Sequence, residues 1–280
     1  MTDAALPLAF AELGAGVGIG SPQPAGWEAL ADFPLLILVG VTGVGKSTAL
    51  EALSAAGLDY CLLPDRRALT DRLIIPSVQA QRGEPAAPLA DRKLRFAYTR
   101  AYRDQNPGGM AHALAQLWID PQVQEGALLF DGLRGANEVT HAAALLPNAL
   151  FVVLQAPDAV RVARLMGRND PFDRIGGNRP DAGSDSVQRF ADIGADEAAG
   201  SFSEVEEEAL LDLVRSGTVS AAALRDSLAI VLEERRSYDP AATKAALLDA
   251  APFRTLVVDT QRHPPEEVGA LIARFVLRQM

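Results

Sequence analysis

The stretch LLILVGVTGVGKST, residues 35–48, decides the fold. Its first five residues form a continuous apolar run, which is typical of a strand buried on both faces of a parallel sheet. The residues that follow fit the spacing G-x-x-x-x-G-K-[ST] without a gap, and a helical pattern then begins at Lys46. Strand, glycine-rich loop and helix together predict a phosphate-binding loop in an α/β fold.

Each part of this loop has a chemical reason. Glycines let the backbone wrap so that its N–H groups point inward and hold an anion, and the helix that follows adds its positive end. Lys46 can reach the β- and γ-phosphates, and the Ser47 hydroxyl can bind Mg²⁺. We therefore expect ATP and Mg²⁺ as cofactors, although this motif does not distinguish ATP from GTP. The expected contact residues are Gly40, Thr42, Gly43, Val44, Gly45, Lys46, Ser47 and Thr48.

Four further apolar runs of strand length follow along the chain, at residues 60–63, 127–130, 150–154 and 255–258. Helical patterns separate them. They lie at residues 46–56, 89–102, 109–117, 138–146, 158–166 and 266–277. Strands that alternate with helices predict a three-layer α/β sandwich with a parallel sheet of about five strands, and the phosphate-binding loop after the first of them is the motif of P-loop NTPases.

Two segments depart from this alternation. Residues 1–33 are rich in alanine, glycine and proline, and we interpret them as a flexible leader. Residues 180–250 contain helical patterns and no strand-like run, and Ser203 and Glu206 have the spacing of a capping box. We therefore expect a P-loop core at 34–179 and 251–280, interrupted by an acidic helical insertion at 180–250 that serves as a lid or partner surface.

Composition limits the classes of function. The 280 residues are 49% hydrophobic and 22% charged, as in a soluble globular protein, and no apolar run approaches the roughly 18 residues that span a bilayer. The N-terminus lacks the basic region of a secretory signal. The single cysteine, Cys61, excludes an internal disulfide and a cysteine-based zinc site. We expect a cytoplasmic protein with no membrane partner, and its oligomeric state stays open.

Charge is distributed unevenly along the chain. The formal net charge is −10, yet residues 65–104 hold nine lysines and arginines against five acidic residues, whereas residues 180–239 hold five against fourteen. A protein that coats nucleic acid is expected to be basic overall. Local arginine-rich stretches in an acidic chain fit a small anionic ligand better, so we do not expect extended nucleic-acid binding.

An aspartate, Asp131, ends the apolar run ALLFD. A carboxylate at the carboxyl end of a strand can hold Mg²⁺ through water or orient an acceptor hydroxyl. The alternative is a structural role, because Asp131 precedes a helical pattern and could cap it. Asp65, which follows the second apolar run in the sequence LPDRR, is the second candidate acid.

The phosphate-binding loop, the turn DGLRGANE (131–138) and the segment APDAVRVARLMGRND (156–170) resemble the nucleoside and nucleotide kinase branch of P-loop NTPases, which includes adenylate kinase and dephospho-coenzyme A kinase. The resemblance implies that Asp131 and Arg134 face the phosphate acceptor, and that Arg164 and Arg168 belong to a helix and lid over the ATP phosphates. Adenylate kinases usually have a proline before the arginine of this turn. Here Arg134 follows Leu133 directly, which leaves the acceptor open.

The segment LLPDRRALTDRLIIP (62–76) is where the acceptor is expected. Guanidinium groups bind phosphate in a bidentate manner, so Arg66, Arg67 and Arg72, with Asp65 beside them, are candidate acceptor-binding residues. The resulting hypothesis is a kinase that transfers the γ-phosphoryl group of ATP to a nucleotide, nucleoside or related small phosphorylated metabolite. Lys46, Asp131, Arg134 and Arg168 are its candidate catalytic residues.

Two alternatives stay open at this point. The first is a regulatory ATPase or nucleotide-dependent switch that uses the insertion as an effector surface. The second is a polynucleotide 5′-hydroxyl kinase that uses the arginines of residues 65–104. No N-K-x-D motif of a Ras-type GTPase is found in the sequence. Stimulation of ATP turnover by a small acceptor would favour the small-molecule kinase. Stimulation by a protein would favour the regulatory ATPase or switch, and stimulation by an oligonucleotide would favour the polynucleotide kinase.

Overall fold

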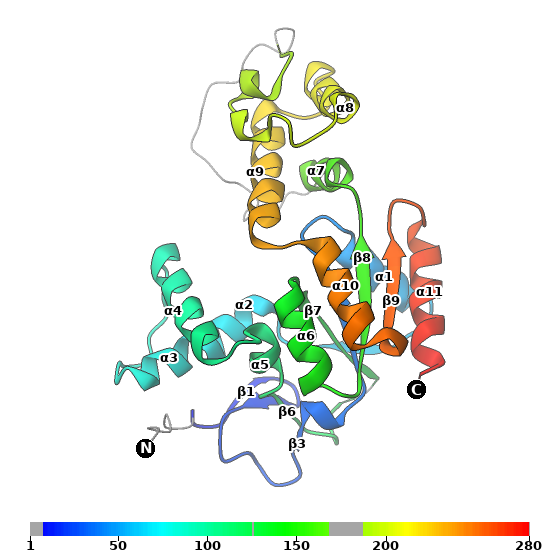
Figure 1. Ribbon diagram of the computed structural model, residues 1–280. Coiled ribbons are helices and arrows are strands. Elements are labelled where there is room, and N and C mark those ends of the chain that lie inside the picture. Colours follow the sequence, from blue (N-terminus) through cyan, green and yellow to red (C-terminus); the bar gives the residue numbers. More distant parts are fainter. Residues whose placement is uncertain (1–7, 125, 168–186, 280) are drawn as a thin grey trace.

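A computed structural model describes residues 8–124, 126–167 and 187–279 (Figure 1). Its centre is a sheet of five parallel strands in the order β5–β7–β4–β8–β9, flanked by helices on both faces. This confirms the predicted α/β sandwich with a five-stranded parallel sheet. The strands are β4 (Leu35–Val39), β5 (Tyr60–Leu62), β7 (Ala127–Leu133), β8 (Ala149–Gln155) and β9 (Thr255–Asp259).

Strand β4 lies in the middle of this sheet because every one of its side chains is apolar and buried. It pairs in parallel with β7 on one side and with β8 on the other. Leu35, Ile37 and Val39 belong to one hydrophobic core, and Leu36 and Leu38 belong to the core on the opposite face. Because successive side chains of a strand point to opposite faces of the sheet, β4 contributes to the hydrophobic cores on both faces.

The helices form one layer on each face of the sheet. Helices α1 (Lys46–Ala55) and α11 (Pro265–Leu277) pack together on one face. Helices α5 (Met110–Leu114), α6 (Ala136–Leu145) and α10 (Pro240–Ala250) cover the other face. Next to this second layer lie α2 (Arg66–Leu69), the π-helical turn η2 (Thr70–Ile74), α3 (Ile75–Gln81) and α4 (Arg92–Gln105).

The N-terminal residues that the structure describes do not form a flexible leader, which corrects the expectation for residues 1–33. They form three strands of a second, antiparallel sheet of order β1–β2–β6–β3. The buried side chains of Val17, Ile19 and Ile119 join this sheet to the main core. The strands are β1 (Ala11–Gly14), β2 (Val17–Ile19), β3 (Glu28–Ala29) and β6 (Trp118–Ile119), and the helical turn η1 (Leu30–Asp32) leads into β4.

A helical lobe stands over the carboxyl end of the main sheet (Figure 1). It has its own hydrophobic cluster, to which residues of α7, α8 and α9 contribute, and Ser203 and Glu206 form the predicted capping box. Helix α10 was expected to be part of this insertion, but it packs against α6 in the core. The lobe consists of α7 (Asp158–Met166), η5 (Phe190–Ile193), η6 (Asp196–Ala198), α8 (Glu204–Arg215) and α9 (Ala221–Ser237).

Within the described residues, no helix combines the length and the apolar character that crossing a membrane requires.

Candidate phosphate-binding site

The glycine-rich loop connects β4 to α1 at the carboxyl end of the main sheet. Gly40, Gly43 and Gly45 have φ values of 156°, 83° and 95°, which side-chain-bearing residues rarely adopt. Gly45 is the N-cap residue of α1 and, being glycine, has no side chain that could cap the helix. The loop therefore wraps tightly and ends at a helix N-terminus whose N–H groups are not capped by a side chain, as an anion-binding loop requires.

The first turn of α1 carries the polar side chains that the motif predicts. The Lys46 ammonium group donates to the carbonyl oxygens of Gly40, 2.8 Å away, and Val41, 3.1 Å away. Lys46 therefore closes the loop from inside. Ser47 and Thr48 follow it and are both exposed to solvent.

A carboxylate from the helical lobe reaches this loop. Glu234 lies on α9 and is only 7% exposed. Its oxygens accept hydrogen bonds from the main-chain N–H of Thr42, at 2.9 and 3.2 Å, and from the Thr42 hydroxyl at 2.6 Å. They also accept from Arg134 Nη1 at 2.8 Å and from Arg161 Nη2 at 2.5 Å. Thus a loop amide, a hydroxyl and two guanidinium groups converge on one carboxylate.

Arg161 is the most buried charged residue of this network, with 1% of its surface exposed. Besides Glu234, it donates through Nε to the Thr42 carbonyl oxygen at 2.8 Å and through Nη1 to Asp158 at 2.6 Å. Asp158 in turn forms an ion pair with Arg235. The network therefore joins α7 and α9 to the backbone of the glycine loop.

Asp131 lies at the carboxyl end of β7, the neighbour of β4. The strand continues to Leu133, and its pairing with β4 is irregular between Phe130 and Leu133. The N-cap residue of α6 is Gly135, so Asp131 does not cap that helix. Among the described residues, no hydrogen bond or ion pair involves the Asp131 carboxylate. A partly exposed carboxylate at this position is open to a ligand.

A divalent cation at this site has few protein ligands to draw on. The described residues contain no cluster of three or more histidine, cysteine, aspartate or glutamate side chains that could hold a metal ion. Mg²⁺, however, is commonly bound by one or two protein groups together with substrate phosphates and water. The exposed Ser47 hydroxyl and the Asp131 carboxylate fit that pattern, because they lie at the carboxyl ends of adjacent strands.

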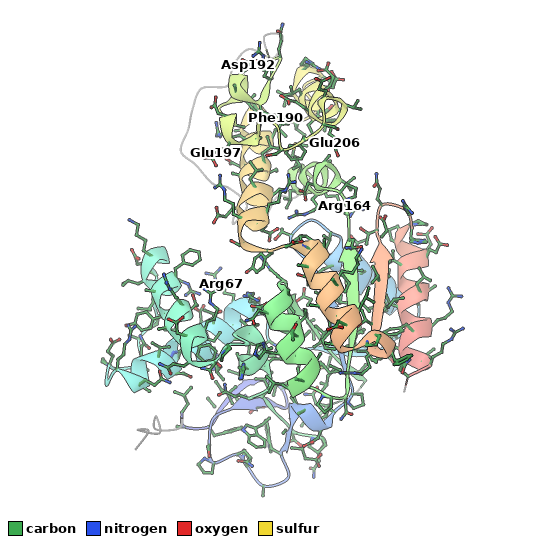
Figure 2. All side chains as sticks on the ribbon, viewed as in Figure 1. Arg67, Arg164, Phe190, Asp192, Glu197 and Glu206 are labelled. Atoms are coloured by element: carbon green, nitrogen blue, oxygen red, sulfur yellow. The ribbon has the colours of Figure 1, made fainter. Side chains whose placement is uncertain are left out.

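A cavity of about 440 Å³ opens beside the loop, and Glu234 is not among the residues that line it. Arg164, predicted to contact ATP, lines it from α7 and donates to the Thr260 hydroxyl at 2.8 Å and the Thr260 carbonyl at 2.8 Å. Figure 2 places Arg164 where α7 meets the main sheet. The other lining residues are Gly45, Thr48, Ala49, Thr260, Gln261, Arg262, His263, Pro264, Pro265 and Val268.

Of the three arginines predicted to bind the acceptor, only Arg66 is directed toward the carboxyl end of β7. It donates to the Gly132 carbonyl oxygen at 2.9 Å and forms a bidentate pair with Glu138 at 2.6 and 2.9 Å. Burial of the guanidinium opposes its charge, but the Glu138 carboxylate outweighs that effect, and the pKa of Arg66 is raised. The Arg134 main-chain N–H donates to the same carboxylate at 3.2 Å.

The remaining predicted residues lie elsewhere. The Asp65 carboxylate caps α2 by accepting from the Ala68 N–H at 2.7 Å. The Arg67 side chain is exposed on α2, beside Asp71 and away from Arg164 (Figure 2). The Arg72 side chain reaches the Glu12 carbonyl oxygen in the small sheet. Arg168, predicted to be catalytic, lies outside the described residues.

Sequence reasoning missed Arg161 and Glu234. A local signal existed for Arg161, because it lies beside Val162 and Leu165 on the apolar face of α7. A similar signal existed for Glu234, which lies on α9 in line with the buried residues Leu224, Leu228 and Val231. A charged residue on an apolar helix face indicates a buried partner. The identity of that partner, a loop 192 residues away, has no local signal.

No protein-family model matches the chain, and no curated protein matches it. Solved structures that align with it include TT1252 from Thermus thermophilus, at 17% identity, with 89% of this chain and 98% of that chain covered and a TM-score of 0.38. A sugar kinase from Janibacter sp. HTCC2649 aligns at 14% identity, with 87% and 94% covered and a TM-score of 0.34. Shikimate kinase from Acinetobacter baumannii, in complex with shikimate, aligns at 15% identity, with 89% and 96% covered and a TM-score of 0.36.

Proposed function

We propose that this chain is an ATP-dependent phosphotransferase that acts on a small acceptor. The observation that carries the proposal is the glycine-rich loop Gly40–Ser47, which leaves the central strand of a parallel sheet and opens α1 without a side-chain cap. Ligands of open α/β sheets bind outside the carboxyl ends of the strands, and an uncapped helix N-terminus preceded by such a loop holds phosphate.

The neighbouring cavity supports a nucleoside triphosphate as the donor. Its volume of about 440 Å³ lies within the range of small-molecule sites, and it adjoins the loop at Gly45. Arg164, Pro264 and Pro265 would contact the base and ribose, and the glycine loop with Lys46 would hold the phosphates. The apolar side chains of the lining, those of Ala49, Pro264, Pro265 and Val268, would pack against the base, and its polar side chains would contact the ribose and phosphates.

Phosphoryl transfer requires positioning and charge neutralisation and little covalent chemistry from the protein. The acceptor oxygen forms a bond to the γ-phosphorus as the bond to the β–γ bridging oxygen breaks, and ADP leaves. The proton of the acceptor hydroxyl passes to the Asp131 carboxylate. Ser47 would hold Mg²⁺ directly and Asp131 would hold it through water, which leaves the Asp131 carboxylate able to take the proton, and the bound ion would neutralise part of the phosphate charge. Lys46 and Arg134 stabilise the charge that develops on the transferred group.

We propose a nucleotide, nucleoside or related small phosphorylated metabolite as the acceptor. The acceptor would approach the carboxyl end of β7, where Asp131 lies beside Arg134 and Arg66. Both guanidinium groups have a carboxylate partner, Arg66 with Glu138 and Arg134 with Glu234, so either one would bind an acceptor phosphate in exchange for that carboxylate.

A regulatory ATPase or nucleotide-dependent switch is a second candidate, and one observation favours it. Glu234 belongs to the helical lobe and contacts the glycine loop directly, so that ligand binding at the loop can be transmitted to α9. In that case the acceptor is water, and a protein partner of the lobe would stimulate turnover.

Transfer of the labelled γ-phosphoryl group of ATP, with Mg²⁺, tests the proposal. Nucleosides, nucleotides, coenzyme A precursors and a 5′-hydroxyl oligonucleotide serve as acceptors. Lys46→Ala supplies the background, and Lys93→Ala, on the exposed surface of α4, is the matched control. Transfer to one small acceptor that Lys46→Ala abolishes and Lys93→Ala retains supports the kinase. Lys46-dependent ATP binding with release of phosphate only, and no labelled acceptor, supports the switch instead.

A further inference from the structure

The Glu234 carboxylate is held in the manner of a bound anion. Five hydrogen bonds from Thr42, Arg134 and Arg161 reach its two oxygens. One of these donors is a main-chain N–H of the glycine loop, the kind of group that such a loop presents to phosphate. An ion pair that only stabilised the packing of α9 against the core would not require a hydrogen bond from a main-chain N–H of the loop.

The charge balance of the network points the same way. Arg134 and Arg161 carry two positive charges, and Asp158, the other carboxylate in contact with Arg161, is shared with Arg235. Without the Glu234 carboxylate, Arg134 would have no anionic partner among the described residues, and the buried Arg161 would keep only the Asp158 that it shares with Arg235. Buried charges of this kind require a partner of opposite sign. The pocket that holds Glu234 is therefore built for an anion.

The pocket also offers one donor more than Glu234 uses. Arg134 Nε is buried and has no hydrogen-bond acceptor among the described residues. A carboxylate has two oxygens, whereas a terminal phosphoryl group has three and carries more negative charge. A phosphoryl group could therefore accept the bonds now made to Glu234 and one from Arg134 Nε as well.

We propose that Thr42, Arg134 and Arg161 form an oxyanion site for the terminal phosphoryl group of a nucleoside triphosphate, and that Glu234 occupies this site until the nucleotide displaces it. The inference rests on the proposed function, because it assumes that the loop binds a nucleotide. Glu234 acts as an internal competitor. Its displacement releases the C-terminal part of α9 from the loop and couples nucleotide binding to the helical lobe.

The first test removes the competitor. Glu234→Gln and Glu234→Ala are compared with the unmodified chain and with Glu233→Gln, which alters the exposed neighbour of Glu234 on the same helix. Binding of a non-hydrolysable ATP analogue, of ADP and of inorganic triphosphate is measured by calorimetry. We expect both Glu234 variants to bind the two triphosphates at least about tenfold more tightly, equivalent to about 1.4 kcal/mol. ADP, which lacks the terminal group, gains much less, and Glu233→Gln changes nothing.

The outcomes separate this inference from the proposed function. If the ATP analogue binds through Lys46 but Glu234→Gln and Glu234→Ala bind it no better, the competitor role is overturned and the proposed function stands. If the folded Glu234 variants and the unmodified chain all fail to bind every probe, both are overturned. Binding that appears only in the Glu234 variants supports both.

A second measurement uses the unmodified chain, so it also decides the matter if the Glu234 variants do not fold. Amide hydrogen exchange over residues 230–237 is compared with and without the ATP analogue at saturation. Displacement of Glu234 predicts faster exchange in this part of α9, because its attachment to the loop is lost. Unchanged or slower exchange on binding shows that Glu234 stays in place and overturns the inference.

Discussion

Arg161 donates from Nε to the main-chain carbonyl oxygen of Thr42, so that a side chain of α7 fixes the backbone of the glycine loop across 2.8 Å. Because the same guanidinium binds Asp158 and Glu234, the loop, α7 and α9 share one buried charge network. The conformation of the loop thus depends on residues that belong to the helical lobe.

Replacing Arg161 should destabilise the fold strongly. Arg161→Ala removes the most buried cation of the network and leaves Glu234 with Arg134 and Asp158 with Arg235, and removing one member of a buried ion pair costs about 3–5 kcal/mol. The measurement is the free energy of unfolding in urea. Arg262→Ala, which removes an arginine with 81% of its side chain exposed, should change that free energy by no more than about 0.5 kcal/mol. If Arg161→Ala and Arg262→Ala changed the free energy of unfolding equally, the buried charge network would not be a main source of stability.

Gly43→Ala should impair both folding and nucleotide binding. Gly43 has a φ of 83°, and a Cβ there would lie 3.0 Å from the Arg161 carbonyl oxygen. The backbone strain costs about 1–3 kcal/mol, and the loop must also shift away from α7. Gly57→Ala is the matched control, because Gly57 has a φ of 80° with open space around it. It should lose stability but bind the ATP analogue normally, and weaker binding by both variants would contradict the argument.

The central part of the fold could be predicted from the sequence because its signals are local. The apolar run Leu35–Val39 coincides with β4, and the glycine loop and Lys46 follow where the motif places them. The small sheet was missed because its strands are two to four residues long and because β2 and β3 pair with the distant strand β6. Gly18 pairs with Trp118, about a hundred residues away, in a strand of only two residues. Strands this short leave no periodic pattern to detect.

The candidate site was predicted only in part for the same reason. Lys46 and Asp131 lie in continuous motifs, whereas Glu234 reaches the loop from α9 through tertiary packing. Arg66 was predicted as a free phosphate clamp, but Glu138, 72 residues away, pairs with it. The composition of the segment around Arg66 indicated positive charge correctly and could not show which charges are neutralised on folding.

Asp131 and Asp65 were competing candidates for the acid role, and substitution can separate them. Asp131→Asn should lower the rate of phosphoryl transfer by about 10²–10⁴-fold, because an amide cannot take the acceptor proton, while the ATP analogue still binds. Steady-state transfer and equilibrium binding are measured together. Asp65→Asn serves as the control, since it alters only the cap of α2 and costs about 1 kcal/mol of stability or less. Normal transfer by Asp131→Asn would exclude it as the base.

Tyr102 predicts how stability depends on alkaline pH. Tyr102 lies on α4 and its ring belongs to the main hydrophobic core, with 2% of its surface exposed, and its hydroxyl accepts a hydrogen bond from Gln116 at 2.9 Å. Burial disfavours the phenolate and raises the pKa of Tyr102 to about 12, although the Gln116 hydrogen bond opposes this. In the unfolded chain the hydroxyl regains its ordinary pKa of about 10.

The neutral tyrosine therefore contributes stability that is fully present below about pH 10 and is lost as the pH rises toward 12, because only the unfolded state releases the proton in this window. The expected loss is about 2–3 kcal/mol for a shift of about two pKa units. Urea unfolding of the unmodified chain and of Tyr102→Phe is measured at several pH values. Other groups titrate in both proteins, so the difference in the free energy of unfolding between the two proteins isolates the contribution of Tyr102. This difference in the free energy of unfolding should shrink as the pH rises. A difference that stays constant would mean that Tyr102 ionises equally in the folded and unfolded states.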